Sequence, residues 1–403
     1  MSRYQRYAEE LTGLIRSGEL APGARLPSVR EASRQRRVSP STVFEAYYLL
    51  QARGLIESRP RSGFYVRPDA ALEKAPKAAP SRTRPVAVSE LVFEVLEATR
   101  KPGLVPLGSA FPGAELFPFR PLARALSAGM ALLEPARIVE DLPPGNERLR
   151  HQIALRYGLS GTSISPDEIV ITNGAMEALT LSLQAVTSPG DAVAVESPAF
   201  YAALQALERL RLKAIEIPCD AHRGLDLAAL AEALRRHDVK ACWFMPTFQN
   251  PTGSSLDQDA RRTLMRLLDE HEVPLIEDDV YAELYYGAHP LPPVKALDTR
   301  GLVMHCGSFS KCLAPGYRVG WVAGGRYTEA ITRAKTMTTL STAVPSQHAL
   351  AQYLDAGGYE RHLRKLRRTL ERQYDFAARL AARFFPAGTR LGVPAGGYFL
   401  WVE

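Results

Sequence analysis

The chain has 403 residues, of which 46% are hydrophobic, and it carries a formal net charge of +7. This length and apolar content can fill one large core and a small additional domain. No apolar run approaches the roughly 18 residues of a membrane-spanning helix, and the N-terminus lacks the apolar stretch of a signal peptide, so neither a membrane protein nor an exported protein is indicated.

The first 68 residues carry nearly all of this net charge. They contain 12 arginines, no lysine and 6 glutamates, which is a net charge of +6 out of +7. A local excess of basic residues is the electrostatic footprint of a polyanionic partner. The sequence therefore predicts that this segment binds nucleic acid.

Three helices and a pair of strands are predicted in this segment. An apolar stripe over residues 4–15 predicts the first helix. Ser28 and Glu31 form a capping box that opens the second helix, and Ser39 caps the third. Two short strands, 55–57 and 63–66, are then expected to form a wing.

Residues 1–68 resemble the winged helix-turn-helix of GntR-type bacterial regulators. The runs 18–31, 38–43, 54–56 and 62–66 carry the resemblance. It implies that the third helix enters the major groove of a double-stranded DNA operator. The residues it implies at the DNA are Ser39, Ser41 and Thr42 near the start of that helix, with Arg30, Arg59 and Arg61 at phosphates or in the minor groove.

Residues 69–104 are predicted to be a linker. They include Pro76, Pro80, Pro85 and Pro102, together with alanine, serine and alternating charge, and show no sustained apolar period before about Leu91. A coil of this composition would let the head dock far from its own body.

The body, residues 105–403, begins its series of motifs with a strand, a glycine turn and a helix. Residues 169–172 predict a buried strand, and Asn173-Gly174-Ala175 leads into a helix that reaches Val186. The turn aims backbone N–H groups and a helix dipole at one point, which suits a phosphate. The same pattern recurs in α/β proteins without any ligand.

The second motif places an aromatic ring after a strand. Residues 193–195 lead into a proline turn at Pro198, which presents Phe200 and its neighbour Tyr201. Either ring could stack on a pyridine ring, and a one-residue slip exchanges the two. A purely structural core aromatic is the alternative.

Two further strands end in polar residues. Asn250 lies in an Asn-Pro-Thr-Gly turn, which is ordinary turn chemistry but could also donate to the phenolic oxygen of a pyridine cofactor. Residues 274–277 predict a strand that ends at Asp278, whose carboxylate can pair with a protonated pyridine nitrogen. Tyr281 can share the phenolic oxygen with Asn250. A solvated strand end is the alternative.

The most informative motif follows the apolar run 302–304. Ser308 and Ser310 come just before Lys311, and Arg318 comes seven residues after it. A lysine amine can hold an aldehyde cofactor as a Schiff base, while hydroxyl and guanidinium groups bind its phosphate. By itself, such a loop could equally be a solvated turn.

In this order the motifs make residues 105–403 similar to the fold type I aminotransferases that use pyridoxal 5'-phosphate. The similarity implies an α/β domain with a mostly parallel sheet. It implies that Lys311 is the catalytic, cofactor-bearing lysine, that Asp278 is the partner of the pyridine nitrogen, and that Phe200 is the stacking ring. The remaining cofactor-binding residues that it implies are Asn250 and Tyr281 at the phenolic oxygen, and Gly174, Ala175, Ser308, Ser310 and Arg318 at the phosphate.

A GntR-type head fused to an aminotransferase-like body is the layout of the MocR family of bacterial transcriptional regulators, which this chain resembles over almost its whole length. The resemblance implies a cytoplasmic, DNA-binding homodimer whose output responds to pyridoxal phosphate or to a small amino compound. The family's body usually continues past the strand that matches residues 396–402 and carries there an arginine for a substrate carboxylate. No residue here matches that arginine, so an incomplete C-terminal small domain is expected.

Three functions are compatible with these motifs. The first is a regulator whose cofactor site is a sensor. The second is a working aminotransferase that kept a DNA-binding head, against which the missing arginine counts. The third is a dimerisation scaffold with an empty site.

The cysteines and histidines predict no metal site. Cys219, Cys242, Cys306 and Cys312 form neither a C-x-x-C pair nor a metal-ligand spacing, and they are expected to be reduced, mostly buried thiols. The 8 histidines are scattered. Cys312 is adjacent to Lys311. It is either a small packing residue or a reactive thiol.

Overall fold

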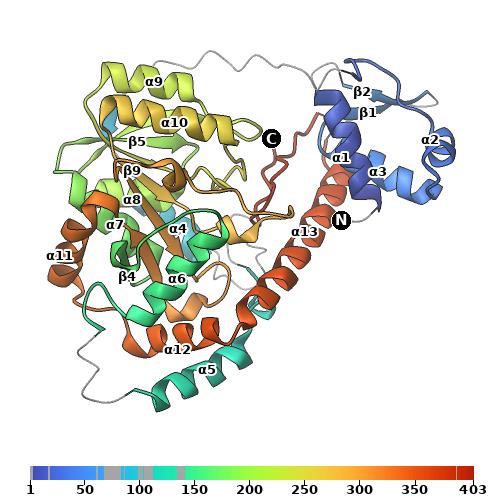
Figure 1. Cartoon of the computed structure of the whole chain (residues 1–403). Coiled ribbons are helices and arrows are strands. Elements are labelled where there is room, and N and C mark those ends of the chain that lie inside the picture. The colour runs from blue at the N-terminus through green and yellow to red at the C-terminus, as the bar shows by residue number, and fades with distance from the viewer. Residues whose placement is uncertain are drawn as a thin grey trace. The chain divides into compact units, whose positions relative to one another are not determined.

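The structure is a computed structural model that describes residues 3–16, 19–59, 62–67, 83–85, 87–98, 103, 112–133, 141–386 and 388–403. The chain divides into two compact units (Figure 1). The head unit comprises Met1–Ala78, Leu370–Val393 and Leu400–Glu403. The sheet unit comprises Ala79–Thr369 and Pro394–Phe399.

The head unit contains the helices and the strand pair that the sequence predicts. The Ser28 hydroxyl accepts from the Glu31 N–H while the Glu31 carboxylate accepts from the Ser28 N–H, which completes the predicted capping box. Ser39 accepts from the Thr42 N–H and caps the next helix. The elements are α1 (Arg3–Arg16), α2 (Val29–Arg36), α3 (Pro40–Ala52), β1 (Ile56–Arg59) and β2 (Gly63–Val66).

The end of the chain joins the head unit, although the sequence interpretation assigned it to the aminotransferase-like segment. The long helix α13 (Gly358–Phe384) brings Asp375 to α1. There the Tyr4 hydroxyl and the Gln5 amide donate to the Asp375 carboxylate at 3.0 and 2.7 Å. These long-range polar contacts explain why Leu370–Val393 group with the head, whereas Pro394–Phe399 belong to the sheet unit.

The sheet unit is built on one nine-stranded sheet in which β7 pairs only with β6 and the others follow the order β3-β6-β5-β8-β9-β10-β11-β4. The central strands β6, β5, β8, β9 and β10 are parallel, and β11 runs antiparallel to both of its neighbours, β10 and β4. The carboxyl ends of β4, β5, β8, β9 and β10 therefore meet at one edge. The strands are β3 (Thr83–Pro85), β4 (Ile169–Thr172), β5 (Ala192–Ser197), β6 (Lys213–Asp220), β7 (Gly224–Leu225), β8 (Val239–Phe244), β9 (Leu275–Asp278), β10 (Val303–Ser308) and β11 (Gly320–Ala323).

Side chains that alternate along these strands build two cores, one on each face of the sheet. Trp243 and Ile276 point into one core, while their neighbours Phe244 and Leu275 point into the other. Since both faces are covered by helices, the parallel strands are buried and read as continuous apolar runs. The covering helices are α7 (Ala175–Val186), α8 (Tyr201–Arg209) and α11 (Thr328–Thr338) on the first face, with α9 (Leu227–Arg236) and α10 (Gln258–His271) on the second (Figure 1).

The remaining helices surround this layered core. The pair α5 and α12 packs closely together. In the described part of the chain, no helix is both long and apolar enough to cross a membrane. The other helices are α4 (Ser89–Ala98), α5 (Phe119–Ala131), α6 (Glu147–Leu159) and α12 (Val344–Asp355), with short 3-10 turns at Ala114–Leu116, Pro166–Glu168, Ala282–Leu284, Val294–Leu297, Pro315–Tyr317 and Gly325–Tyr327.

Part of the predicted linker is ordered, which differs from the expected coil. Residues 83–85 form β3, an edge strand antiparallel to β6, and residues 89–98 form α4. The Glu208 carboxylate accepts hydrogen bonds from the Val88 N–H and from the Ser89 N–H and hydroxyl, at 2.9 to 3.0 Å. These long-range contacts order a segment whose composition alone favours a coil. Most of the other linker residues lie outside the described ranges.

Candidate cofactor site and nucleic-acid interface

Five of the predicted motifs meet at one edge of the sheet because each follows the carboxyl end of a strand. Gly174 follows β4, Phe200 follows β5, and Asn250 follows β8. Asp278 ends β9, and Lys311 lies three residues beyond β10. In open α/β sheets this edge is where ligands bind.

Asp278 is a buried carboxylate with an unused oxygen. Its side chain is 1% exposed, and Oδ1 has no hydrogen-bond partner in the described structure. Burial raises the pKa of Asp278 to about 7, although hydrogen bonds from Trp243 and from the Val280 N–H oppose the rise. An orphaned buried acceptor of this kind suits a cationic N–H group, such as the protonated nitrogen of a pyridine ring.

Lys311, Tyr281 and Asn250 lie together beside this carboxylate. The Lys311 Nζ is 5.8 Å from the centre of the Tyr281 ring. Burial raises the pKa of Tyr281, the Asp278 charge adds to the rise, and hydrogen bonds from Tyr398 and Asn250 oppose it. Burial lowers the pKa of Lys311, and the Arg318 charge lowers it further against the opposing Asp278 charge. A larger share of the amine is therefore neutral and nucleophilic.

The predicted phosphate ligands form a cradle at the start of α7. The Arg318 Nη1 donates to the Ser310 Oγ at 3.2 Å, and the Ser308 Oγ lies 3.0 Å from the Ser310 Oγ. Gly174, the N-cap of α7, provides no capping side chain, so the N–H groups of the first turn point toward this cluster. Together they offer the donors that a phosphate requires. Ser308 is the last residue of β10 rather than part of the predicted loop.

Gly174→Ala is expected to disrupt this cradle. Gly174 has φ +79°, and an added Cβ would lie 2.5 Å from the Arg318 Nη2, so the substitution strains the backbone and displaces the guanidinium. We expect at least about a tenfold loss of affinity for pyridoxal phosphate, because an ionic hydrogen bond is misplaced. A cofactor titration followed by absorbance measures the loss. Gly158→Ala, where an added Cβ meets nothing within 4 Å, is the control, and equal affinities of the two variants would contradict the assignment.

The aromatic stacking residue stays a prediction. Phe200 is half-buried at the N-cap of α8, and its ring centre is 5.0 Å from that of Tyr201. Tyr201 is close enough to Tyr281 for its phenolate charge to raise the pKa of Tyr281. Tyr201 therefore lies near the site. Both candidates from the sequence therefore lie at this strand end.

Several residues of the site were not predicted from the sequence. The ring centre of Tyr398 is 5.4 Å from that of Tyr281, and Trp243 hydrogen-bonds Asp278. Glu196 is a buried acid whose pKa is raised to about 8 by burial. It accepts from the Met245 N–H at 3.1 Å and from the Gln249 amide at 3.3 Å. Tertiary packing brings Tyr398, Trp243 and Glu196 to the site, and their spacing in the sequence does not indicate it.

A buried hydrogen-bonded chain extends from the residue next to Asp278. The Trp321 Nε1–H donates to the Tyr157 hydroxyl at 2.9 Å, which lies 2.6 Å from the His305 Nδ1. The His305 Nε2 is 2.9 Å from the Asp279 Oδ2. Glu277, Asp279 and His305 place their ligand atoms close together, as a metal site requires, but both ring nitrogens of His305 are already hydrogen-bonded. The arrangement favours a positioning network for the end of β9.

The exposed face of α3 is the candidate DNA-reading surface. Ser41 is exposed, and the Ser39 hydroxyl lies 2.9 and 2.8 Å from the hydroxyls of Ser41 and Thr42. Phe44 is 48% exposed and its ring centre is 5.4 Å from that of Tyr48. Phe44 was missed in the sequence, although its helical spacing of three from Ser41 indicates the same face. An exposed aromatic ring suits apolar contact with a thymine methyl group.

The predicted phosphate-contacting arginines differ in their surroundings. Arg30 is exposed on α2. Arg59 pairs with Glu57 at 2.8 Å and stacks 4.4 Å from the centre of the Tyr65 ring, so part of its charge is already compensated. Arg61 lies outside the described residues.

Comparison with known proteins resolves the family. Residues 3–66 match the bacterial regulatory proteins of the gntR family, and residues 128–403 match aminotransferase class I and II. The chain is 49% identical to the HTH-type transcriptional regulator YdcR of Escherichia coli, over all of this chain and 86% of that protein. The chain belongs to the MocR family. The chain is also 36% identical to the HTH-type transcriptional regulator YjiR of Escherichia coli, over all of this chain and 86% of that protein.

The body of this MocR-family chain also matches solved aminotransferases. The kynurenine aminotransferase of Pyrococcus horikoshii is 34% identical with a TM-score of 0.70, and the match covers 77% of this chain and 78% of that one. The multiple substrate aminotransferase of Thermococcus profundus is 29% identical with a TM-score of 0.71, covering 77% and 79%. The predicted α/β fold with a GntR-type head is therefore confirmed.

Proposed function

We propose that the chain is a DNA-binding transcriptional regulator whose sheet unit binds pyridoxal 5'-phosphate. Its output would respond to that cofactor or to a small amino compound. The observation that carries the cofactor part is the orphaned Oδ1 of buried Asp278, which faces the same site as Lys311. The regulatory part is supported by the GntR-type head and by relatives of the same layout that are named as HTH-type regulators.

The proposed roles follow from the chemistry of each side chain. When bound, pyridoxal phosphate supplies an aldehyde and an electron-withdrawing ring. Lys311 offers the aldehyde an amine whose pKa is lowered by burial, and Asp278 would neutralise the charge of the ring nitrogen. Asn250 and Tyr281 donate to the phenolic oxygen. The phosphate would be held by Ser308, Ser310, Arg318 and the first turn of α7, at Gly174 and Ala175.

A homodimer that reads two half-sites of an operator in the cytoplasm completes the proposal, as the MocR resemblance implies. Paired half-sites match the symmetry of a dimer. Crosslinking of the full chain in the presence of operator DNA tests this part.

The DNA-binding role predicts a difference between Arg30 of the head unit and an arginine of the sheet unit that carries the same charge. Arg30→Gln removes an exposed cation from the head, so affinity should fall alike on all sequences and the slope of log K against log salt should flatten by about one. Ser41→Ala should instead change which sequences are enriched from a pool of random duplexes. Arg235→Gln, on α9 and 67% exposed, is the matched control. A similar loss in that control would place DNA binding outside the head.

Aminotransferase activity is the second candidate function. It is favoured by the lowered pKa of Lys311, since a neutral amine is also what proton transfer to and from a bound substrate requires. Turnover of amino donors by the cofactor-loaded chain separates the two functions. Steady product formation that depends on Lys311 supports an enzyme, and binding without turnover supports a sensor.

A further inference from the structure

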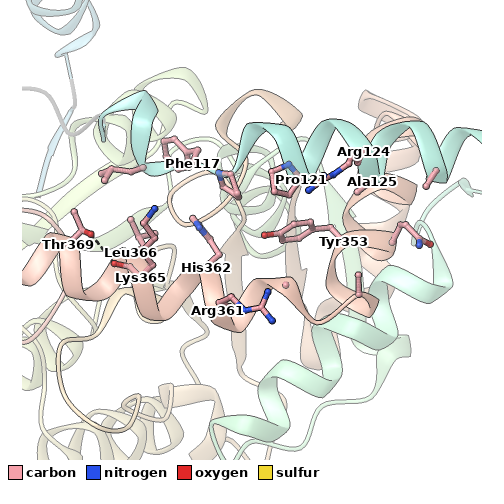
Figure 2. A pocket seen from close by; sticks show the side chains of 16 residues that line it. Phe117, Pro121, Arg124, Ala125, Tyr353, Arg361, His362, Lys365, Leu366 and Thr369 are labelled. Carbon is pink, nitrogen blue, oxygen red and sulfur yellow. Dashed lines mark hydrogen bonds between the residues drawn. The ribbon is translucent and has the colours of Figure 1, made fainter.

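A cavity of about 580 Å³ lies in the sheet unit between α5, α12 and the first half of α13 (Figure 2). This volume is within the range of pockets for small organic ligands. None of its 16 lining residues is among the residues proposed to hold the cofactor. Phe117 and Pro121 belong to the α5 side of the cavity, and Tyr353 belongs to the α12 side.

The polar lining of this cavity is cationic. Arg124 comes from α5, and Arg361 and Lys365 come from α13, while no lining residue is acidic. Arg361 and Lys365 are one helical turn apart, a spacing at which like charges repel. None of the three forms an ion pair with a described residue. A bound anion would relieve this repulsion, and the apolar wall would accept an uncharged body attached to it.

One lining residue connects the cavity to the loop of Lys311. The His362 Nε2–H donates to the backbone carbonyl of Cys312 at 2.7 Å. Cys312 follows Lys311 directly, and its thiol is buried with its Sγ 2.9 Å from the Tyr359 hydroxyl. A ligand that shifts the His362 ring therefore changes a hydrogen bond to the peptide next to Lys311.

We propose that this cavity binds a small organic anion, a carboxylate or phosphate on an apolar body, at a site separate from the cofactor. Arg124, Arg361 and Lys365 bind the charged group, and Phe117, Pro121 and Tyr353 contact the body. His362 relays occupancy to the Lys311 loop. The binding part is independent of the proposed function, whereas the relay rests on cofactor binding at Lys311.

Calorimetric titration of the full chain with phenyl phosphate and with inorganic phosphate tests the binding part. One equivalent of pyridoxal phosphate, followed by desalting, blocks the phosphate cradle while leaving no excess to fill the cavity, and an Arg318→Gln chain repeats the titration with that cradle weakened. We expect one phenyl phosphate per chain in both preparations, bound about tenfold or more tightly than inorganic phosphate because its ring contacts the apolar wall. Absence of binding in both preparations would overturn the proposal.

Matched charge variants locate the site. The double variant Arg361→Gln/Lys365→Gln should lose about tenfold or more in phenyl phosphate affinity, since two ionic hydrogen bonds are removed. The control Arg364→Gln/Arg368→Gln removes two exposed charges from the same helix outside the lining and should change affinity less than about twofold. An equal loss of phenyl phosphate affinity in both double variants would mean that the ligand is attracted generally to a basic surface, such as one that binds DNA phosphates. That result would refute the proposed site. Ala128→Phe fills the cavity without changing charge and should also abolish binding.

The relay is read from the visible spectrum of the cofactor-loaded chain. Phenyl phosphate should shift that spectrum in the parent chain. His362→Phe, which keeps a ring but removes the donor to Cys312, should bind phenyl phosphate yet show no shift. A shift that persists in His362→Phe refutes the relay. If the chain takes up no cofactor, the proposed function fails, and the titration of the Arg318→Gln chain still decides the cavity.

Discussion

Replacing Lys311 with alanine is expected to abolish the visible absorbance that pyridoxal phosphate acquires when a protein lysine holds it. Lys311 is the lysine that follows β10 at the ligand-binding edge of the sheet, and burial lowers the pKa of its amine. Cofactor held only by the phosphate cradle and Asp278 should dissociate on gel filtration. Absorbance before and after desalting measures both effects.

Lys213→Ala is the matched control for this result. Lys213 is exposed on β6, away from the carboxyl-end edge of the sheet, so its removal should leave the absorbance unchanged. Retention of the lysine-bound spectrum in Lys311→Ala would show that another amine holds the cofactor. Circular dichroism of both variants confirms that the chain still folds.

Asp278→Asn is expected to stabilise the cofactor-free protein while weakening cofactor binding. The pKa of Asp278 is raised by burial from 3.8 to about 7. Protonation therefore favours the folded state: this contribution is fully present below about pH 4 and is lost as pH rises through 7. A shift of this size corresponds to an order of 4 kcal/mol in the free energy of unfolding. Asparagine cannot ionise, so the variant should exceed the parent in stability near pH 8, and the difference should vanish near pH 4.

Chemical denaturation across this pH range measures the difference, and Asp298→Asn provides a control of opposite sign. Although burial alone would raise it, hydrogen bonds from the Val303 and Leu302 N–H groups and the Lys295 charge hold the pKa of Asp298 below its ordinary value. Asp298→Asn should therefore destabilise the protein at neutral pH.

The Asp278→Asn chain should also bind pyridoxal phosphate at least about tenfold more weakly, because the ring nitrogen loses its counter-charge. Unchanged stability and affinity would remove Asp278 from the assignment.

The elements that the sequence predicted well are those specified by neighbouring residues. The capping box of Ser28 and Glu31 depends on a spacing of three residues, and so does the cap that Ser39 provides to Thr42. The strand ends at Thr172 and Asp278 follow from short apolar runs bounded by polar residues. Because parallel strands bring their carboxyl ends together, their order in the sequence was enough to predict a shared site.

The parts that the sequence could not predict depend on contacts between distant residues. β3 is ordered by β6, and Tyr398 reaches Tyr281 from more than a hundred positions away. Gly320 carries no motif, yet an added Cβ there would lie 2.5 Å from the Gly174 carbonyl carbon, so β11 must pass close beneath the phosphate cradle. Such close approaches become visible only after the strands have been placed side by side.

The ion pairs that the head's glutamates form with arginines affect the rate at which the head associates with DNA. Glu9, Glu10 and Glu57 each pair with an arginine, and Glu31 is held in the capping box. Beyond a screening distance of about 8 Å at physiological salt, each such pair is electrically neutral. What remains at long range is the net charge of +6, which attracts the DNA phosphates before any contact forms. Added salt should therefore slow association, because it shortens the range over which that charge steers the approach.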